Sequence, residues 1–452
     1  MIYSAAKLLQ VPADDLAQVG PARIEIGSGV RASLAQIAAA LAPRKIALLV
    51  DQTKIAAPDS DLKAWAGETL GGIGQVTTVV LPASTSADES AVIQAKTGCA
   101  GADLVVSVGS GTISDIGKVA AGERPHVIVQ TAASVNGYSD DESVLLKAGV
   151  KRTEISHYAH ALLIDTEVLA LAPKRLNRSG LGDTISMFTA VADWYLAHQV
   201  GMNDRWSQTA AWVHLRHGGQ TLAAARGIGE SSAAELEFLA KMLTISGLSM
   251  GMARQTSPSS GMEHTVSHML DMWASAHTQP HQLHGAQVGV TTLWAALLWR
   301  RVRKLLDAGE FPEVSVPDTA KQERLVKSVF DRIDPSGRSA AECWSDYSAK
   351  LDRYLAIGLP VRVKAFTADW PKHRAFLDQC LRDPAELAAA LNDAGAIAKS
   401  TELTTPQTAL WALTNSHLMR NRFNVCDLAY AAGLWTPDVA AEIIAEADAL
   451  SA

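Results

Sequence analysis

The chain has 452 residues, 48% of them hydrophobic, and a formal net charge of −7. This length exceeds the usual size of one hydrophobic core, so two domains are expected. Basic residues are scattered along the chain, which argues against nucleic acid or an anionic membrane as the main partner and favours a small-molecule ligand.

The four cysteines are far apart in the sequence and form no Cys-x-x-Cys pair, which argues against a thiolate metal site or a disulfide framework. A reducing compartment suits such cysteines. The N-terminus lacks a basic region followed by an apolar run, and no stretch approaches the apolar length that spans a bilayer. We therefore expect a soluble, cytoplasmic protein.

Residues 1–172 alternate short apolar runs with alanine-rich helical stretches, which is the pattern of an α/β domain. Near-continuous apolar strands imply a parallel sheet covered on both faces. The runs expected to be strands are 45–50, 77–81, 103–108, 127–129 and 161–165.

Three segments that follow these strands are candidate ligand contacts. Asp51 ends the first strand, where its carboxylate could accept hydrogen bonds from the ribose hydroxyls of an adenosine, and a turn residue at a strand end is an equally open interpretation. Polar loops beyond strand ends often bind ligands, but an ordinary polar loop remains the alternative for the segment that holds Thr131, Ser134 and Asn136. Lys151 and Arg152 follow, before the last strand.

The glycine loop after the third strand predicts a phosphate site. Small residues at a sharp turn from strand to helix leave backbone N–H groups and the positive end of the helix dipole free to hold a pyrophosphate. The loop lacks the full Gly-x-Gly-x-x-Gly spacing, and any tight turn favours glycine. The candidate contacts are Gly109, Ser110, Gly111 and Thr112, with Asp115 in the helix beyond.

From residue 173 onwards helical spacing replaces the strand-like runs, so residues 173–452 are expected to form an all-α domain. We expect Asp183 in the first turn of a helix that continues through Ile185 and Tyr195. The segment from Leu305 to Lys321 reads as a surface loop or insertion.

His264 and His268 are four residues apart, so a helix places both imidazoles on one face, and His284 would return opposite them. A carboxylate such as Asp183 would complete a site for a divalent cation with an open coordination position. Polar residues on a helix surface are the alternative for the histidine pair.

Several motifs fall in an order that resembles the glycerol-1-phosphate dehydrogenases of the iron-containing alcohol dehydrogenase and dehydroquinate synthase-like superfamily. The resemblance covers nearly the whole chain. Its motifs are Gly109-Ser110-Gly111-Thr112, Thr131-Ala132-Ala133-Ser134, Gly180-Leu181-Gly182-Asp183, Ser260-Gly261-Met262-Glu263-His264, His284-Gly285 and Arg420-Asn421-Arg422-Phe423.

The resemblance implies that Asp183, His264 and His284 bind one catalytic divalent metal (zinc, nickel or iron), that His268 lies nearby, and that the glycine loop binds NAD or NADP in a cleft between the two halves. It implies interconversion of sn-glycerol-1-phosphate and dihydroxyacetone phosphate, a role in phospholipid metabolism and a homo-oligomer. Asn136, Lys151 and His268 are then expected at the substrate.

Two departures from the family pattern bear on the substrate. Asn136 replaces a usual aspartate, and Met187 replaces a lysine that is frequent in bacterial relatives. The alternatives are a dehydrogenase of an unphosphorylated polyol or related alcohol, a dehydroquinate synthase-like cyclase, and a non-catalytic nucleotide-binding relative.

Overall fold

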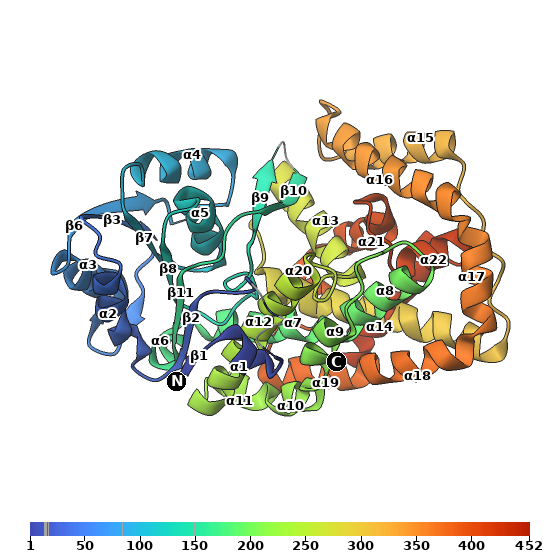
Figure 1. The fold of residues 1–452 in the computed structure, drawn as a ribbon. Coiled ribbons are helices and arrows are strands. Elements are labelled where there is room, and N and C mark those ends of the chain that lie inside the picture. The colour runs from blue at the N-terminus through green and yellow to red at the C-terminus, as the bar shows by residue number, and fades with distance from the viewer. Residues whose placement is uncertain (13–15, 17, 84, 148–149) are drawn as a thin grey trace. The chain divides into compact units, whose positions relative to one another are not determined.

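The computed structural model describes residues 1–12, 16, 18–83, 85–147 and 150–452 (Figure 1). Within them the chain groups into two compact units. The first comprises Met1–Lys147, Lys151–Thr184 and Ala224–Met252, and the second consists mainly of Ile185–Ala223 and Ala253–Ala452. The expected domain boundary after residue 172 stays a prediction.

A sheet forms the centre of the first unit (Figure 1), and within the described residues it has seven strands in the order β1-β2-β11-β8-β7-β3-β6. Neighbouring strands are parallel, except that β1 pairs antiparallel with β2. All five strands expected from the sequence are present. The strands are β1 (Ile2–Tyr3), β2 (Arg23–Gly27), β3 (Lys45–Asp51), β6 (Gln75–Leu81), β7 (Leu104–Gly109), β8 (His126–Gln130) and β11 (Ala161–Asp165), and two smaller sheets pair β4 (Ala56–Ala57) with β5 (Ser60–Asp61) and β9 (Glu142–Lys147) with β10 (Val150–Ile155).

Alternating side chains of the inner strands β3 and β7 enter two different cores, which is why these two strands are apolar almost throughout. Leu48 and Val106 belong to one buried cluster, whereas Ala47, Leu49 and Val105 belong to another. The expectation of a parallel sheet buried on both faces is therefore confirmed. The clusters include residues of α2 (Ser33–Ala40), α3 (Leu62–Gly71) and α6 (Thr166–Leu171) in the first case and of α4 (Glu89–Gly98) and α5 (Gly111–Ala121) in the second.

The order of the strands reverses at β3. The chain runs from β3 to β6 on one side and then returns to β7 on the other side. In open parallel sheets, ligands bind outside the carboxyl ends of the strands at such a reversal. Asp51, Gly109 and Gln130 end the adjacent strands β3, β7 and β8, so the segments singled out in the sequence begin at neighbouring positions on this edge.

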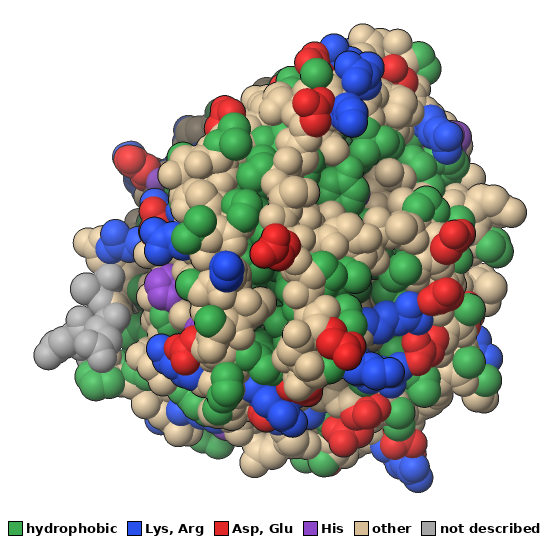
Figure 2. Space-filling model, turned by 90° about the vertical axis from the view of Figure 1, so that its right-hand side faces the viewer, with side chains coloured by type: hydrophobic (Ala, Val, Ile, Leu, Met, Phe, Trp, Pro, Cys, Tyr) green, Lys and Arg blue, Asp and Glu red, His purple; other side chains and the backbone are tan. Residues whose placement is uncertain are grey.

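Residues 173–452, all of them described, contain no strand, which confirms the expected change to a helical region. No helix among the described residues is both long and apolar enough to cross a membrane. The face in Figure 2 shows basic and acidic side chains interspersed among apolar ones. The helices are α7 (Lys174–Ile185), α8 (Met187–Gln199), α9 (Gln208–Leu215), α10 (Gly218–Ala223), α11 (Ala225–Glu230), α12 (Ala233–Ala253), α13 (Met262–Ala276), α14 (His284–Ala308), α15 (Thr319–Phe330), α16 (Arg338–Ile357), α17 (Leu359–Ala368), α18 (Trp370–Cys380), α19 (Pro384–Ala394), α20 (Ser400–Leu403), α21 (Pro406–Asn415), α22 (Val425–Ala431) and α23 (Pro437–Leu450), with α1 (Ala5–Leu9) near the N-terminus.

Two expectations about local structure are corrected. Asp183 lies in the last turn of α7 and not in the first turn of the next helix, because helical backbone continues through the glycines of its motif. The segment expected to be a loop from Leu305 is helical up to Ala308, and the irregular stretch is confined to residues 309–318.

Candidate metal centre and dinucleotide site

Asp183 is held where α7 touches the loop that follows β8. A Cβ atom at Gly180 would lie 1.9 Å from the carbonyl oxygen of Ala133, so only glycine permits this approach of helix to loop. Asn177 stabilises the same contact between α7 and the loop, since its Oδ1 accepts a hydrogen bond from the N–H of Ala133 at 3.0 Å. Gly180 of the Asp183 motif therefore lets the helix lie close to the backbone of the loop.

Asn136 contacts Asp183 through its main chain. Its N–H donates to Oδ2 of Asp183 at 2.9 Å, while its side-chain Nδ2 donates to Oγ of Ser246 at 2.9 Å. Gly247 leaves room for this loop, because a Cβ there would lie 2.7 Å from the carbonyl oxygen of Asn136. The amide that replaces the usual aspartate thus fastens the loop to α12.

The first turn of α13 carries His264 beside a buried carboxylate. Oε1 of Glu263 lies 3.0 Å from Nδ1 of His264 and accepts a hydrogen bond from the N–H of Gly261 at 2.6 Å. Asp193 lies against the same turn and accepts from the N–H of Met262 at 2.8 Å. Burial, with a further contribution from the negative charge of Glu263, raises the pKa of Asp193 well above its ordinary value.

His284 opens α14, which packs against α13. Its ring centroid lies 5.1 Å from that of His264 and 6.1 Å from that of His268. His264 and His268 both lie on α13, as the four-residue spacing predicted, and the structure buries both of them.

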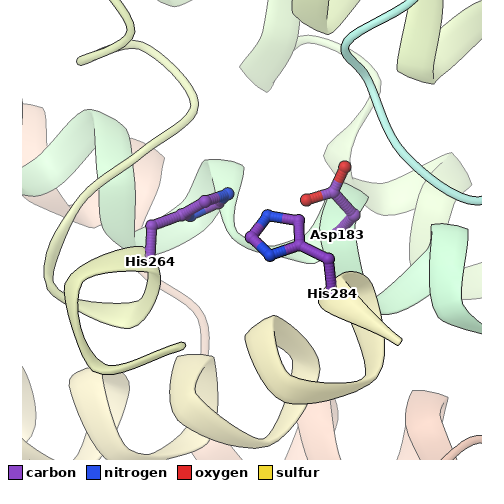
Figure 3. Close-up of side chains that lie close together, drawn as sticks. All are labelled: Asp183, His264 and His284. Atoms are coloured by element: carbon purple, nitrogen blue, oxygen red, sulfur yellow. The ribbon is translucent and has the colours of Figure 1, made fainter. Parts of the chain in front are cut away.

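Asp183, His264 and His284 each place one potential ligand atom within 4.8 Å of the others (Figure 3). Asp183 and His264 are buried, and His284 is half-buried. Two imidazole nitrogens and one carboxylate oxygen suit a borderline divalent ion that keeps an open coordination position. The residues present therefore fit a catalytic metal. His268 is not part of this group.

The glycine loop joins β7 to α5 within the first unit. A Cβ at Gly109 would lie 2.6 Å from Cβ of Ile113, and a Cβ at Gly111 would lie 2.7 Å from Cγ2 of Val135, so packing alone already demands both glycines. The Ser110 side chain makes no capping hydrogen bond to α5. The N-terminal N–H groups of this helix therefore have no side-chain cap, which suits a pyrophosphate.

Asp51 forms an ion pair with Lys63 of α3. The ammonium group of Lys63 contacts Oδ1 of Asp51 and also donates to the carbonyl oxygen of Asp51 at 2.7 Å. The carboxylate accepts a further hydrogen bond from the N–H of Thr53 at 2.9 Å. A ribose hydroxyl at Asp51 would therefore meet a carboxylate whose charge is partly neutralised.

Asp115 lies on α5 near two other charged groups. Lys118 is buried and pairs with Asp140 at 2.5 Å, and its distance to Asp115 is 3.8 Å. Although 17% of the Asp115 side chain is exposed, burial of its carboxyl group raises its pKa to about 7, and Lys118 only partly opposes that rise. Asp115 can therefore exchange a proton near neutral pH.

Cationic side chains that could bind a substrate phosphate differ in their surroundings. Lys151 and Arg152 lie half-buried on β10. Arg422 donates to Ser260 Oγ at 2.5 Å and contacts Thr256 Oγ1, so it braces the loop that precedes α13. Met187 is a buried apolar residue of α8.

Three polar residues that touch the site were not given roles by the sequence analysis. Glu263 and Ser267 contact the two histidines of the cluster, and Asn177 holds the loop beside Asp183. A carboxylate that directly precedes a candidate histidine ligand was the available signal for Glu263. Ser267 and Asn177 carried no such signal, because a helical serine or asparagine is ordinary.

The chain is similar to known proteins over most of its length. Residues 25–173 match the family described as iron-containing alcohol dehydrogenase. The glycerol-1-phosphate dehydrogenase (NAD(P)+) of Methanococcoides burtonii is 32% identical over 313 residues, which cover 67% of this chain and 83% of that protein. The enzyme of the same name from Natronomonas pharaonis is 32% identical over 270 residues, which cover 57% of this chain and 74% of that protein.

A solved structure shares the fold. The probable glycerol dehydrogenase from Sinorhizobium meliloti superposes with a TM-score of 0.59 at 15% identity, covering 96% of this chain and 98% of that one. At this identity the likeness concerns the fold alone, whereas the sequence matches identify the family. The chain belongs to the glycerol-1-phosphate dehydrogenases of the iron-containing alcohol dehydrogenase superfamily.

Proposed function

We propose that the protein is a metal-dependent, NAD(P)-linked dehydrogenase that interconverts sn-glycerol-1-phosphate and dihydroxyacetone phosphate. The observation that carries the proposal is the approach of Asp183, His264 and His284 to within 4.8 Å, with a donor set suited to a catalytic divalent ion. The names of the two relatives support the substrate and the cofactor.

The proposed metal is zinc, nickel or iron, held by Asp183, His264 and His284. When bound, the ion supplies a Lewis acid for the reacting oxygen and the nicotinamide supplies or accepts the hydride. Asn136 orients Asp183 through its N–H. In the first unit, the uncapped turn at Gly109 to Thr112 holds the pyrophosphate, Asp51 binds the ribose, and Asp115, Thr131 and Ser134 line the cofactor site.

The substrate phosphate needs cationic or N–H donors, because removing a doubly charged group from water without partners is costly. Lys151, which lies half-buried on β10, is the proposed donor. Asn136 and His268 are proposed to lie at the substrate as well.

A second candidate is dehydrogenation of an unphosphorylated polyol. It is favoured by Met187, a buried apolar residue where bacterial relatives often have lysine. A turnover screen separates the two. The chain is loaded with Zn²⁺, Ni²⁺ or Fe²⁺ and assayed with NAD and NADP against glycerol-1-phosphate, glycerol-3-phosphate and glycerol. We expect glycerol-1-phosphate to have the highest kcat/KM, whereas equal kcat/KM for glycerol would overturn the phosphate assignment.

A further inference from the structure

Both histidines of the candidate metal centre make hydrogen bonds through Nδ1. For His264 the partner is Oε1 of Glu263 at 3.0 Å. Glu263 is fully buried, and its carboxylate also accepts hydrogen bonds from the N–H of Gly261 and, at 2.8 Å, from Oγ1 of Thr189. Both oxygens of this carboxyl group thus act as hydrogen-bond acceptors, so Nδ1 of His264 donates to Oε1 and carries the proton, and Nε2 retains a lone pair.

The tautomer of His284 follows from a chain of hydrogen bonds that ends on a carboxylate. Gln287 Nε2 donates to Oδ1 of Asp271 at 3.0 Å, which orients the Gln287 amide because a carboxylate cannot donate. The other end of that amide, Oε1, therefore accepts from Oγ of Ser267 at 2.7 Å.

Ser267 has only one hydroxyl proton, and it is given to Gln287. Its oxygen must therefore accept at the 3.2 Å contact with Nδ1 of His284, so that this nitrogen also carries a proton. Ser267, Asp271 and Gln287 are all buried, so water competes little for these contacts.

We propose that Glu263 and the Ser267–Gln287–Asp271 chain are positioning residues that hold the Nδ1 protons of His264 and His284, so that both imidazoles present Nε2 to the divalent ion. The inference rests on the proposed metal site. Partners of this kind fix ring orientation and raise the basicity of the ligand, and their loss typically costs about 10- to 100-fold in metal affinity.

The hydrogen bonds that hold Nδ1 of His264 and Nδ1 of His284 differ in strength. Glu263 offers a buried negative charge directly to His264, whereas a neutral hydroxyl holds His284 and the charge of Asp271 lies two hydrogen bonds away. Charge-assisted hydrogen bonds are roughly twice as strong as neutral ones. Loss of Glu263 should therefore weaken metal binding more than loss of Gln287.

The series of hydrogen bonds from Ser267 through Gln287 to Asp271 orients His284 and does not conduct protons. Its far end contacts the exposed His281, whose Nδ1 lies 3.3 Å from Oδ1 of Asp271. The amide of Gln287 interrupts proton transfer along this series, because an amide neither gains nor loses a proton near neutral pH. His281 is therefore not joined to the metal centre by a proton relay through this chain.

The test compares metal binding by full-length variants. Zn²⁺ affinity is measured by competition with a chromophoric chelator, and the visible spectrum of bound Co²⁺ reports the geometry at the ion. The variants are Glu263→Ala, Glu263→Gln and Gln287→Leu. Gln322→Leu is the matched control, since Gln322 is another buried glutamine of the second unit, hydrogen-bonded to Tyr430 at 2.8 Å.

We expect Glu263→Ala to raise the Kd for Zn²⁺ by about 10- to 100-fold, with smaller increases for Glu263→Gln and Gln287→Leu and an altered Co²⁺ spectrum in each. Gln322→Leu should lower the Tm and leave both metal readouts unchanged. Because Glu263→Gln preserves the shape of the side chain, it keeps the test informative if the alanine variant fails to fold.

Unchanged Zn²⁺ affinity and Co²⁺ spectra in the folded Glu263 and Gln287 variants, with binding lost in His264→Ala, would overturn the positioning role and leave the proposed metal site intact. If His264→Ala bound Zn²⁺ as tightly as the unaltered chain, the metal site itself would be wrong and the positioning role would fall with it.

Discussion

The main-chain N–H of Asn136 donates a hydrogen bond to Oδ2 of Asp183, and the distance is 2.9 Å. Any residue other than proline can make this contact. The side chain of Asn136 is used elsewhere, on Ser246. The replacement of the usual aspartate by asparagine therefore leaves the support of Asp183 unchanged.

We predict that Asn136→Ala lowers the free energy of unfolding by about 1 kcal/mol, the net worth of a typical hydrogen bond, and changes the Kd for Zn²⁺ by less than threefold, or about 0.7 kcal/mol. Denaturant unfolding and a Zn²⁺ titration measure the two effects. Ser246→Ala removes the other half of the same contact and should match it in stability. A loss of Zn²⁺ binding in Asn136→Ala would show that the side chain acts on the metal site directly.

We predict that His264→Ala abolishes stoichiometric metal and turnover, because two remaining ligands do not hold a catalytic ion. His268→Ala is the matched control, one helical turn away on α13 but outside the cluster. Metal content measured by elemental analysis should remain near one ion per chain in the control. Equal loss of metal in both variants would mean that His268 is also a ligand.

We predict that Lys63 reduces the preference of the Asp51 site for NAD over NADP. Its ion pair partly neutralises the carboxylate, so Lys63→Met should weaken NADPH binding relative to NADH by about tenfold, or ~1.4 kcal/mol. Asp51→Asn should shift the ratio towards NADPH. Fluorescence titration with both reduced cofactors measures the ratio of the Kd values for NADPH and NADH. An unchanged ratio in both variants would show that Asp51 does not bind the ribose.

We predict that Lys151→Met raises the KM for glycerol-1-phosphate by about tenfold or more, corresponding to ~1.4 kcal/mol, and leaves the kinetics with glycerol unchanged. Lys147→Met is the control, because Lys147 lies on the paired strand β9 and forms an exposed ion pair with Glu154. A parallel rise in KM for both substrates in Lys151→Met would indicate a general disturbance of the site.

We predict that His126 destabilises the fold in acid. Burial lowers its pKa from 6.5 to about 3. Between these two pH values His126 therefore binds a proton in the unfolded chain and stays neutral in the folded chain. The contribution to the unfolding free energy should fall by about 1.4 kcal/mol per pH unit between these values.

Asp115 acts in the opposite sense, since its raised pKa lets the folded state bind a proton below about pH 7. The difference in unfolding free energy between the unaltered chain and His126→Gln gives the contribution of the histidine. Denaturant unfolding at pH 7, 6, 5 and 4 should show a shallower decline in the variant. Parallel curves would mean that His126 is not held neutral.

The sequence by itself determined the elements and the residue types of the site. Continuous apolar runs predicted four of the five inner strands, β3, β7, β8 and β11, together with the edge strand β6. They did not predict the inner strand β2, in which Arg23 and Glu25 interrupt the apolar pattern. The four-residue spacing of His264 and His268 placed them on one helix. The order of the motifs identified the family.

Only the tertiary structure decided which side chains meet. Spacing alone could not distinguish His264 from His268 as a partner of Asp183, because both occupy the same helix face. The family resemblance favoured His264, and the structure groups His264 and His284 with Asp183. Asp183 was expected in the first turn of a helix, yet it lies in the last turn of α7, where the missing Cβ of Gly180 admits the carbonyl oxygen of Ala133.

The ion pair of Asp51 with Lys63 and the hydrogen bond of Ser267 with Gln287 likewise depend on contacts between side chains that packing brings together. Local sequence patterns record the period of an element, and such patterns contain no information on which neighbour satisfies a buried polar group.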